Sequence, residues 1–161
     1  MPGVRCKNVA SRLAASRAVA GEKILVTFEL RPIGRVSTPY KSLGDCPRNT
    51  DPNGPACELH IDDDFVPGLA GLTEGQHILV LYWFEHVDRF SLRQKRRGSG
   101  QKTGVFSLRS PHRPNPVGAA VVRIESLNNG CVQIRGMDCL DGTPLLDIKP
   151  ALRSECTEVS G

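Results

Sequence analysis

The stretch with the most chemical information is residues 109–118, which read Arg-Ser-Pro-His-Arg-Pro-Asn-Pro-Val-Gly. Each of its prolines fixes its own φ at about −65° and disfavours helical geometry for the residue before it. A loop with so few accessible conformations loses little entropy on binding, and a guanidinium held in it can donate two parallel hydrogen bonds to a carboxylate or phosphate. The stretch therefore predicts an anion-binding clamp. A proline-rich connector between two strands is the open alternative.

A second candidate is the segment from Arg89 to Lys102, which contains six basic residues and no acidic one. Phosphate contacts from such side chains supply much of the affinity for nucleic acid. The triplet Gly98-Ser99-Gly100 predicts a flexible segment, which suits an RNA-binding arm or a solvated loop equally well. As candidate RNA contacts we name Arg93, Lys95, Arg96 and Arg97, together with Arg113 and Asn115 of the proline-rich stretch.

The bulk composition is that of one water-soluble globular domain. The chain has 161 residues, of which 39% are hydrophobic and 24% charged, and its net charge is +4. Its longest apolar run, residues 77–84, is far shorter than the roughly 20 residues of a membrane-spanning helix and predicts a buried strand. We therefore expect no membrane segment.

The cysteines and histidines show no metal-binding or redox motif. The six cysteines include no Cys-x-x-Cys pair and the four histidines are scattered, so the sequence predicts no metal. With no secretory signal evident, we expect reduced thiols and a cytoplasmic protein.

The elements that must position these residues are short strands. They are expected at 24–30, 33–36, 56–61, 77–84, 105–108, 117–127, 131–137 and 145–148. Asn128-Asn129-Gly130 predicts a tight hairpin, and residues 141–144 predict another turn. This series of short strands separated by turns indicates an all-β domain, an antiparallel barrel or sandwich, over residues 23–153. Residues 154–161 form a tail, and residues 1–22 are an extension for which a helix, a disordered tail and an early start codon all stay open.

The glycine-rich signatures of dinucleotide-binding and phosphate-binding loops are both absent from the sequence. Any nucleotide-like cofactor must therefore be bound in another way.

Two strings carry a resemblance to a known family. They are Arg-Ser-Pro-x-Arg-Pro-Asn-Pro-x-Gly at residues 109–118 and Asp-Gly-Thr-Pro-x-x-Asp-Ile-Lys-Pro at residues 141–150. Over about residues 31–153 the sequence resembles the TsaA-like (YaeB-like) family, whose characterised members are TrmO-type tRNA methyltransferases. The resemblance implies a single-sheet antiparallel β-barrel with short helical or irregular additions. It also implies a homodimer that binds S-adenosylmethionine near the subunit contact.

The same resemblance implies the reaction and the cofactor site. The expected substrate is the threonylcarbamoyl-modified adenosine next to the tRNA anticodon, methylated on its exocyclic nitrogen. Family contacts to the cofactor fall at Asn49, Thr50, Asp51, Glu85, His86, Arg109, Ala119, Gly136, Met137 and Asp138. Residues 49–51 depart from the family's usual Pro-Arg-Gln-Pro-Gly pattern, and Glu85 stands where histidine is common.

The chemistry of methyl transfer asks little of the side chains beyond alignment and the exclusion of water. No catalytic acid or base is assigned. Arg109 can clamp a carboxylate of the cofactor or of the substrate, and Asp138 can accept hydrogen bonds from an ammonium or from ribose hydroxyls. Tyr82 or Phe84 is expected in the core, because alternation along a barrel strand buries one of each pair.

Two other functions stay open. Longer family members carry an additional C-terminal domain, whereas this chain stops eight residues after Arg153. A methyltransferase of the same fold that acts on a non-tRNA substrate is therefore an alternative, and so is a non-catalytic module that binds the cofactor or RNA.

Overall fold

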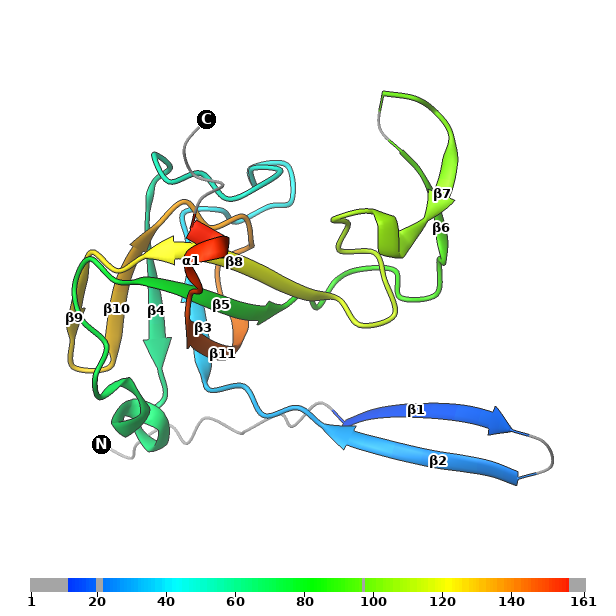
Figure 1. The fold of residues 1–161 in the computed structure, drawn as a ribbon, viewed down its shortest axis with the longest axis horizontal. Helices are drawn as coiled ribbons and strands as arrows, with labels where there is room; N and C mark the ends of the chain where they lie inside the picture. Colours follow the sequence, from blue (N-terminus) through cyan, green and yellow to red (C-terminus); the bar gives the residue numbers. More distant parts are fainter. Residues whose placement is uncertain (1–11, 20–21, 97, 157–161) are drawn as a thin grey trace, which may run out of the picture. The chain divides into compact units, whose positions relative to one another are not determined.

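The computed structural model describes residues 12–19, 22–96 and 98–156, which fall into two units, one ending at Arg31 and the other starting at Pro32 (Figure 1). The first unit contains one antiparallel hairpin of β1 (Arg12–Val19) and β2 (Glu22–Glu29). Part of the N-terminal extension is therefore a strand, although its loose apolar spacing had left a helix open. Its antiparallel pairing with β2 explains the difference. Residues 1–11 lie outside the described residues.

The second unit is built on a seven-stranded antiparallel sheet. The strands follow the order β8-β5-β11-β3-β4-β10-β9. Their bounds are β3 (Gly34–Ser37), β4 (Ala56–Ile61), β5 (His77–Trp83), β8 (Val117–Arg123), β9 (Ser126–Asn128), β10 (Cys131–Arg135) and β11 (Thr143–Pro150). The predicted all-β, antiparallel class is confirmed.

The core lies on one face of this sheet. Along β5, Ile78, Val80 and Tyr82 are buried while the residues between them are only half-buried, as alternation along a strand requires. They pack with apolar residues from five other strands and from two loops, namely Val36, Cys57, Leu59, Ile61, Ala120, Val122, Ile124, Val132, Ile134, Met137, Cys139 and Leu145. Residues 77–84 are therefore the predicted buried strand, and Tyr82 is a core residue.

The predicted strand 117–127 divides into two pieces that pair with different neighbours. β8 pairs with β5, and β9 pairs with β10. Only Ile124 and Glu125 separate them, so the two end strands of the sheet are consecutive in the chain. Among the described residues no ladder joins the two ends of the sheet, so closure into a barrel stays a prediction.

The predicted tight hairpin closes β9 on β10. Asn129 has φ 44° and Gly130 has φ 80°, as the two central residues of a type I′ turn require. Asn128 pairs with Cys131 on either side of that turn.

The segment between β5 and β8 differs from expectation. Residues 105–108 were predicted as a strand, but residues Val105–Ser107 form a single 3-10 turn, η2, in which Val105 is buried and Phe106 is 82% exposed. The prediction was wrong because this four-residue run has no neighbouring strand to pair with. The preceding basic segment, predicted to be flexible, forms a hairpin of β6 (Arg93–Lys95) and β7 (Lys102–Gly104).

Within the part of the chain that the structure describes, helical structure is limited to short pieces. Besides η2 they are η1 (Asp63–Leu69), a 3-10 helix, and α1 (Arg153–Cys156). Neither they nor any other described helix has the length and apolar character needed to cross a membrane.

Candidate functional site: a groove floored by Tyr82 and Asp138

A broad groove opens beside β5 and β8. Its volume is about 2060 Å³, larger than the roughly 300–1,000 Å³ typical of a small-molecule site. It is lined by residues between 43 and 52, by the proline-rich loop 106–113, by the turn 138–141 and by residues of the two strands. The groove has space for a cofactor and for part of a larger substrate.

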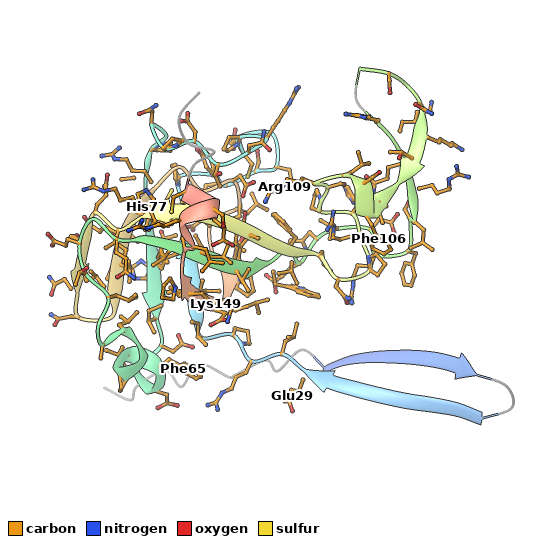
Figure 2. All side chains as sticks on the ribbon, in the orientation of Figure 1. Glu29, Phe65, His77, Phe106, Arg109 and Lys149 are labelled. Carbon is orange, nitrogen blue, oxygen red and sulfur yellow. The ribbon has the colours of Figure 1, made fainter. Side chains whose placement is uncertain are left out.

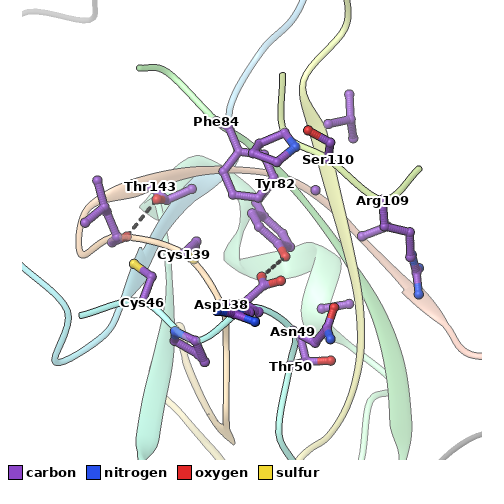
Figure 3. Close-up of a pocket in the computed structure, with 18 of the residues that line it drawn as sticks. Cys46, Asn49, Thr50, Tyr82, Phe84, Arg109, Ser110, Asp138, Cys139 and Thr143 are labelled. Atoms are coloured by element: carbon purple, nitrogen blue, oxygen red, sulfur yellow. Dashed lines mark hydrogen bonds between the residues drawn. The ribbon is translucent and has the colours of Figure 1, made fainter. Parts of the chain in front are cut away.

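The floor of the groove contains a buried hydroxyl and carboxylate in contact. The Tyr82 hydroxyl donates a hydrogen bond to Asp138 Oδ1 (Figure 3). Burial raises the pKa of Asp138, and the Tyr82 hydrogen bond and the Arg109 charge act against that rise. Burial, followed by the Asp138 charge, raises the pKa of Tyr82, so the phenol keeps its proton. A half-buried carboxylate with a perturbed pKa in a groove is typical of a binding or catalytic site.

The glycine that ends the proline-rich string positions the tyrosine. Gly118 lies opposite Tyr82 in the β5–β8 ladder, and a Cβ added at Gly118 would stand 2.2 Å from Tyr82 Cε2. The ring therefore lies directly on the glycine backbone. Any larger residue at this position would displace the tyrosine and its hydrogen bond.

A second glycine docks the 49–54 loop against the floor. Gly136 has φ 67°, and an added Cβ would stand 1.6 Å from the carbonyl oxygen of Asp51. The Asp51 amide donates to the Gly136 carbonyl at 2.9 Å. This contact places Asn49 and Thr50 in the lining of the groove with Asp138 (Figure 3).

The structure separates the ten predicted cofactor residues into two groups. Those that line the groove are Asn49, Thr50, Glu85, His86, Arg109, Ala119 and Asp138. Outside the lining are Asp51, Gly136 and Met137. The Asp51 side chain accepts from the Asn53 amide at 2.9 Å, and Met137 is fully buried in the core. These three residues support the groove without lining it.

The two arginines of the proline-rich loop have different surroundings. Arg113 donates to the carbonyl oxygens of Ser110, at 2.8 Å, Val105 and Leu108, so it stabilises its own loop. Arg109 is exposed, lines the groove and, within the described residues, makes no hydrogen bond or ion pair (Figure 2). Of these two described arginines, only Arg109 is therefore available to clamp an anion in the groove.

Neighbouring residues hold the proline-rich loop from both sides. Arg89 Nε donates to the Pro114 carbonyl at 3.1 Å, and its guanidinium lies 5.2 Å from the centroid of the Trp83 ring. The Ser110 hydroxyl donates to Gln94 Oε1 at 2.7 Å. Asn115, predicted to contact RNA, is exposed but does not line the groove.

Asp141 has a structural role in the turn that follows Asp138. It accepts from the Thr38 amide and the Ser37 hydroxyl, both at 3.1 Å, and from Lys41 Nζ at 2.6 Å. The Lys41 hydrogen bond is the largest cause of its lowered pKa. Ser37 and Thr38 therefore clamp the turn that presents Asp138.

The cysteine beside the floor is not a nucleophile. Burial raises the pKa of Cys139 to about 12, so its sulfur stays protonated and unreactive at neutral pH. Burial also raises the pKa of Cys46, which lines the same groove.

The basic hairpin presents charge and aromatic surface together. Arg93, Lys95, Arg96 and Lys102 are exposed, and Arg97 lies outside the described residues. Phe90 is 93% exposed and Phe106 is 82% exposed at the two ends of this segment. Sequence reasoning missed both phenylalanines, although aromatic residues interleaved with basic ones are a readable signal for single-stranded nucleic acid.

Comparison with known proteins identifies the family. Residues 35–155 match the model of the tRNA-methyltransferase O N-terminal domain. The chain belongs to this family. VirR of Rhizobium radiobacter, a probable S-adenosyl-L-methionine-binding protein, is 41% identical to it over 118 residues, which cover 73% of this chain and 67% of VirR. The tRNA (adenine(37)-N6)-methyltransferase of Mus musculus is 46% identical over 85 residues, which are 51% of this chain and 20% of the mouse protein.

Solved structures agree with this assignment to the tRNA-methyltransferase O family. The crystal structure of TrmO from Pseudomonas aeruginosa superposes with a TM-score of 0.67 at 30% identity, over 84% of this chain and 61% of TrmO. A second crystal structure of TrmO gives a TM-score of 0.65 at 32% identity, over 84% of this chain and 62% of that chain. The chain thus spans about six tenths of these structures.

Proposed function

We propose that this chain is an S-adenosylmethionine-dependent methyltransferase that acts on the exocyclic nitrogen of threonylcarbamoyl-modified adenosine next to the tRNA anticodon. The observation that carries the proposal is the groove, in which the residues of the family strings converge. A half-buried carboxylate, Asp138, and an arginine without hydrogen-bond partners among the described residues, Arg109, line the same surface. The relatives' names for cofactor and substrate point in the same direction.

The charges of the groove suit the cofactor. S-adenosylmethionine, when bound, supplies a methyl group activated by a sulfonium, and it also carries an ammonium and a carboxylate. Asp138 would accept from its ammonium or ribose hydroxyls, and Arg109 would donate to a carboxylate. Asn49, Thr50, Glu85, His86 and Ala119 would surround the rest.

The protein's own task in the reaction would be positioning. Tyr82 holds the Asp138 carboxylate in one orientation, and Gly118 fixes Tyr82. The described groove residues include no activated thiol, because the pKa values of Cys46 and Cys139 are raised. Direct transfer of the methyl to the nitrogen, without a covalent enzyme intermediate, agrees with this arrangement.

The basic hairpin would hold the RNA. Arg93, Lys95 and Arg96 are exposed on or next to β6, where they can contact phosphates. Phe90 and Phe106 offer faces on which unpaired bases of an anticodon loop can stack. Arg97 is a further candidate phosphate contact by its position in the sequence.

A homodimer in the cytoplasm completes the proposal. The outward face of β5 and β8 is apolar, with Leu79, Leu81, Val117, Ala119 and Val121 in cross-strand register. A second copy that covers this face would enclose the groove that β8 lines. Sedimentation equilibrium on wild-type protein and on Val121→Glu tests the interface, and an unchanged dimer in the variant would contradict it.

The test of the activity is transfer of labelled methyl from S-adenosylmethionine to tRNA from a strain that lacks the endogenous enzyme. We expect incorporation with wild type and loss with Asp138→Asn. Incorporation into tRNA with and without the threonylcarbamoyl group then identifies the acceptor.

A module that binds the cofactor without catalysis is the second candidate, since VirR and an Archaeoglobus fulgidus relative, 40% identical over 120 residues, are named as S-adenosyl-L-methionine-binding proteins. Binding without incorporation into any RNA would favour it.

A further inference from the structure

Three potential metal ligands meet on the outer face of β4 and β10, in a part of the sheet that lies outside the groove lining. Glu58 and His60 are two residues apart on β4, so their side chains share one face. Cys131, the first residue of β10, lies directly opposite His60. The Ile61 amide donates to the Gly130 carbonyl at 2.8 Å, so the adjacent pair of His60 and Cys131 is a non-hydrogen-bonded pair. Side chains approach most closely at such pairs.

The three side chains already lie close together. His60 Nε2 lies 2.9 Å from Glu58 Oε2, and one ligand atom from each of the three residues lies within 4.8 Å of the other two. Glu58 and His60 have side chains that are 40% and 54% exposed, so an ion can reach them from solvent.

We propose that Glu58, His60 and Cys131 form a binding site for a divalent cation of the zinc class. A thiolate, an imidazole and a carboxylate are the donors that zinc takes, whereas magnesium and calcium select oxygen ligands alone. Three protein ligands leave a fourth tetrahedral position for water or an exogenous ligand. On binding, the Cys131 S–H bond breaks, its proton passes to solvent and a metal–sulfur bond forms.

The surrounding sheet supports the site. Two paired strands hold all three residues, so little ordering is needed on binding. The adjacent strand β3 places a cation, Arg35, opposite His60, but Arg35 Nη1 donates to the Gly142 carbonyl at 2.7 Å, which directs its charge to that turn. On β10 the residue opposite Glu58 is the neutral Gln133.

The sequence had predicted no metal, and the reason for the difference is register. The known zinc spacings place ligands a few residues apart in one segment. Here Cys131 lies 71 residues beyond His60, and only the pairing of β10 with β4 brings them together. A pattern search along the chain finds no trace of such a site.

Cobalt(II) titration of the reduced protein tests the proposal, because a cobalt–thiolate bond has a near-ultraviolet charge-transfer absorption. Wild type should show this band at one cobalt per chain, and zinc should abolish it. Cys131→Ser should lack the band, and His60→Ala should bind at least about tenfold more weakly, since even partners outside the ligand set cost this much. Cys46→Ser is the matched control, because Cys46 is also a half-exposed free thiol, and it should keep the band.

Three results would overturn the site: no band in wild type, a band that survives Cys131→Ser, or a band lost in Cys46→Ser. Circular dichroism verifies that each variant is folded. The outcome is independent of the methyltransferase proposal, because none of the three residues lines the groove.

Discussion

Replacing Asp138 with asparagine should weaken cofactor binding without lowering the stability of the fold. The asparagine side-chain oxygen can still accept the Tyr82 hydrogen bond, so the floor of the groove keeps its shape. The negative charge, however, is removed. If Asp138 receives hydrogen bonds from the cofactor's ammonium or ribose, Asp138→Asn weakens a charge-assisted contact.

The expected effects of Asp138→Asn on cofactor affinity and on the free energy of unfolding differ in size and in sign. Loss of one charge-assisted hydrogen bond costs about 1.5–3 kcal/mol, which raises the Kd for S-adenosylmethionine about 10- to 150-fold. The free energy of unfolding should not fall. Burial raises the pKa of folded Asp138 above its unfolded value, so its contribution to stability is present at low pH and is lost as the pH rises through the folded pKa. At neutral pH the carboxylate is therefore destabilising, and the neutral amide should match or exceed wild type in Tm.

Isothermal titration and thermal unfolding at neutral pH measure both quantities. The matched control is Asp141→Ala, which removes the acceptor of the Thr38 amide and Ser37 hydroxyl and should cost about 1–2 kcal/mol of stability. The lowered pKa of Asp141 gives its contribution to stability the opposite pH dependence. This contribution is lost as the pH falls through the folded pKa, below 3.8. The reasoning is refuted if Asp138→Asn binds the cofactor as tightly as wild type, or is destabilised as much as Asp141→Ala.

Three further predictions concern the groove and the basic hairpin. Gly118→Ala places a methyl group 2.2 Å from the Tyr82 ring and should lower the free energy of unfolding by about 1–3 kcal/mol, measured by urea denaturation. Unchanged stability would contradict the close packing of Tyr82 on Gly118. Arg109→Ala should weaken S-adenosylmethionine binding about 10- to 150-fold with little change in Tm. Arg113→Ala should instead lower Tm, because it leaves three loop carbonyls without their hydrogen-bond donor. Equal effects of the two variants on binding and on Tm would argue against Arg109 as the clamp. Combined replacement of Arg93, Lys95 and Arg96 by glutamine should reduce the slope of log binding constant against log salt concentration for tRNA by roughly two to three. The affinity for the cofactor should stay unchanged. A slope equal to that of wild type would exclude the hairpin as the RNA contact.

Much of the fold follows from local patterns. The apolar run 77–84 and the dipeptide Asn129-Gly130 each specify their own structure through burial and backbone geometry, and the structure agrees with both. Residues 105–108 look equally strand-like, yet strand formation also requires a partner, which no local pattern reveals. The hairpin β6–β7 was missed for a related reason, because its charged residues pair through the backbone rather than by burial.

The site could be predicted only in part, because its chemistry depends on contacts between distant residues. The family resemblance named Arg109 and Asp138 as cofactor contacts, and both line one groove in the structure. Arg113 was named as an RNA contact, and its hydrogen bonds to carbonyl oxygens of its own loop could not be read from the sequence. The hydrogen bond of Tyr82 to Asp138 spans 56 residues and arises from the sheet that carries the tyrosine.

The measurement that tests the central claim most directly is incorporation of labelled methyl from S-adenosylmethionine into threonylcarbamoyl-modified tRNA, with wild type and Asp138→Asn side by side. The account predicts stoichiometric methylation of the modified adenosine by wild type and a large loss in the variant. Cofactor bound by wild type with no methyl transferred to tRNA, under conditions in which a known TrmO is active, would contradict it.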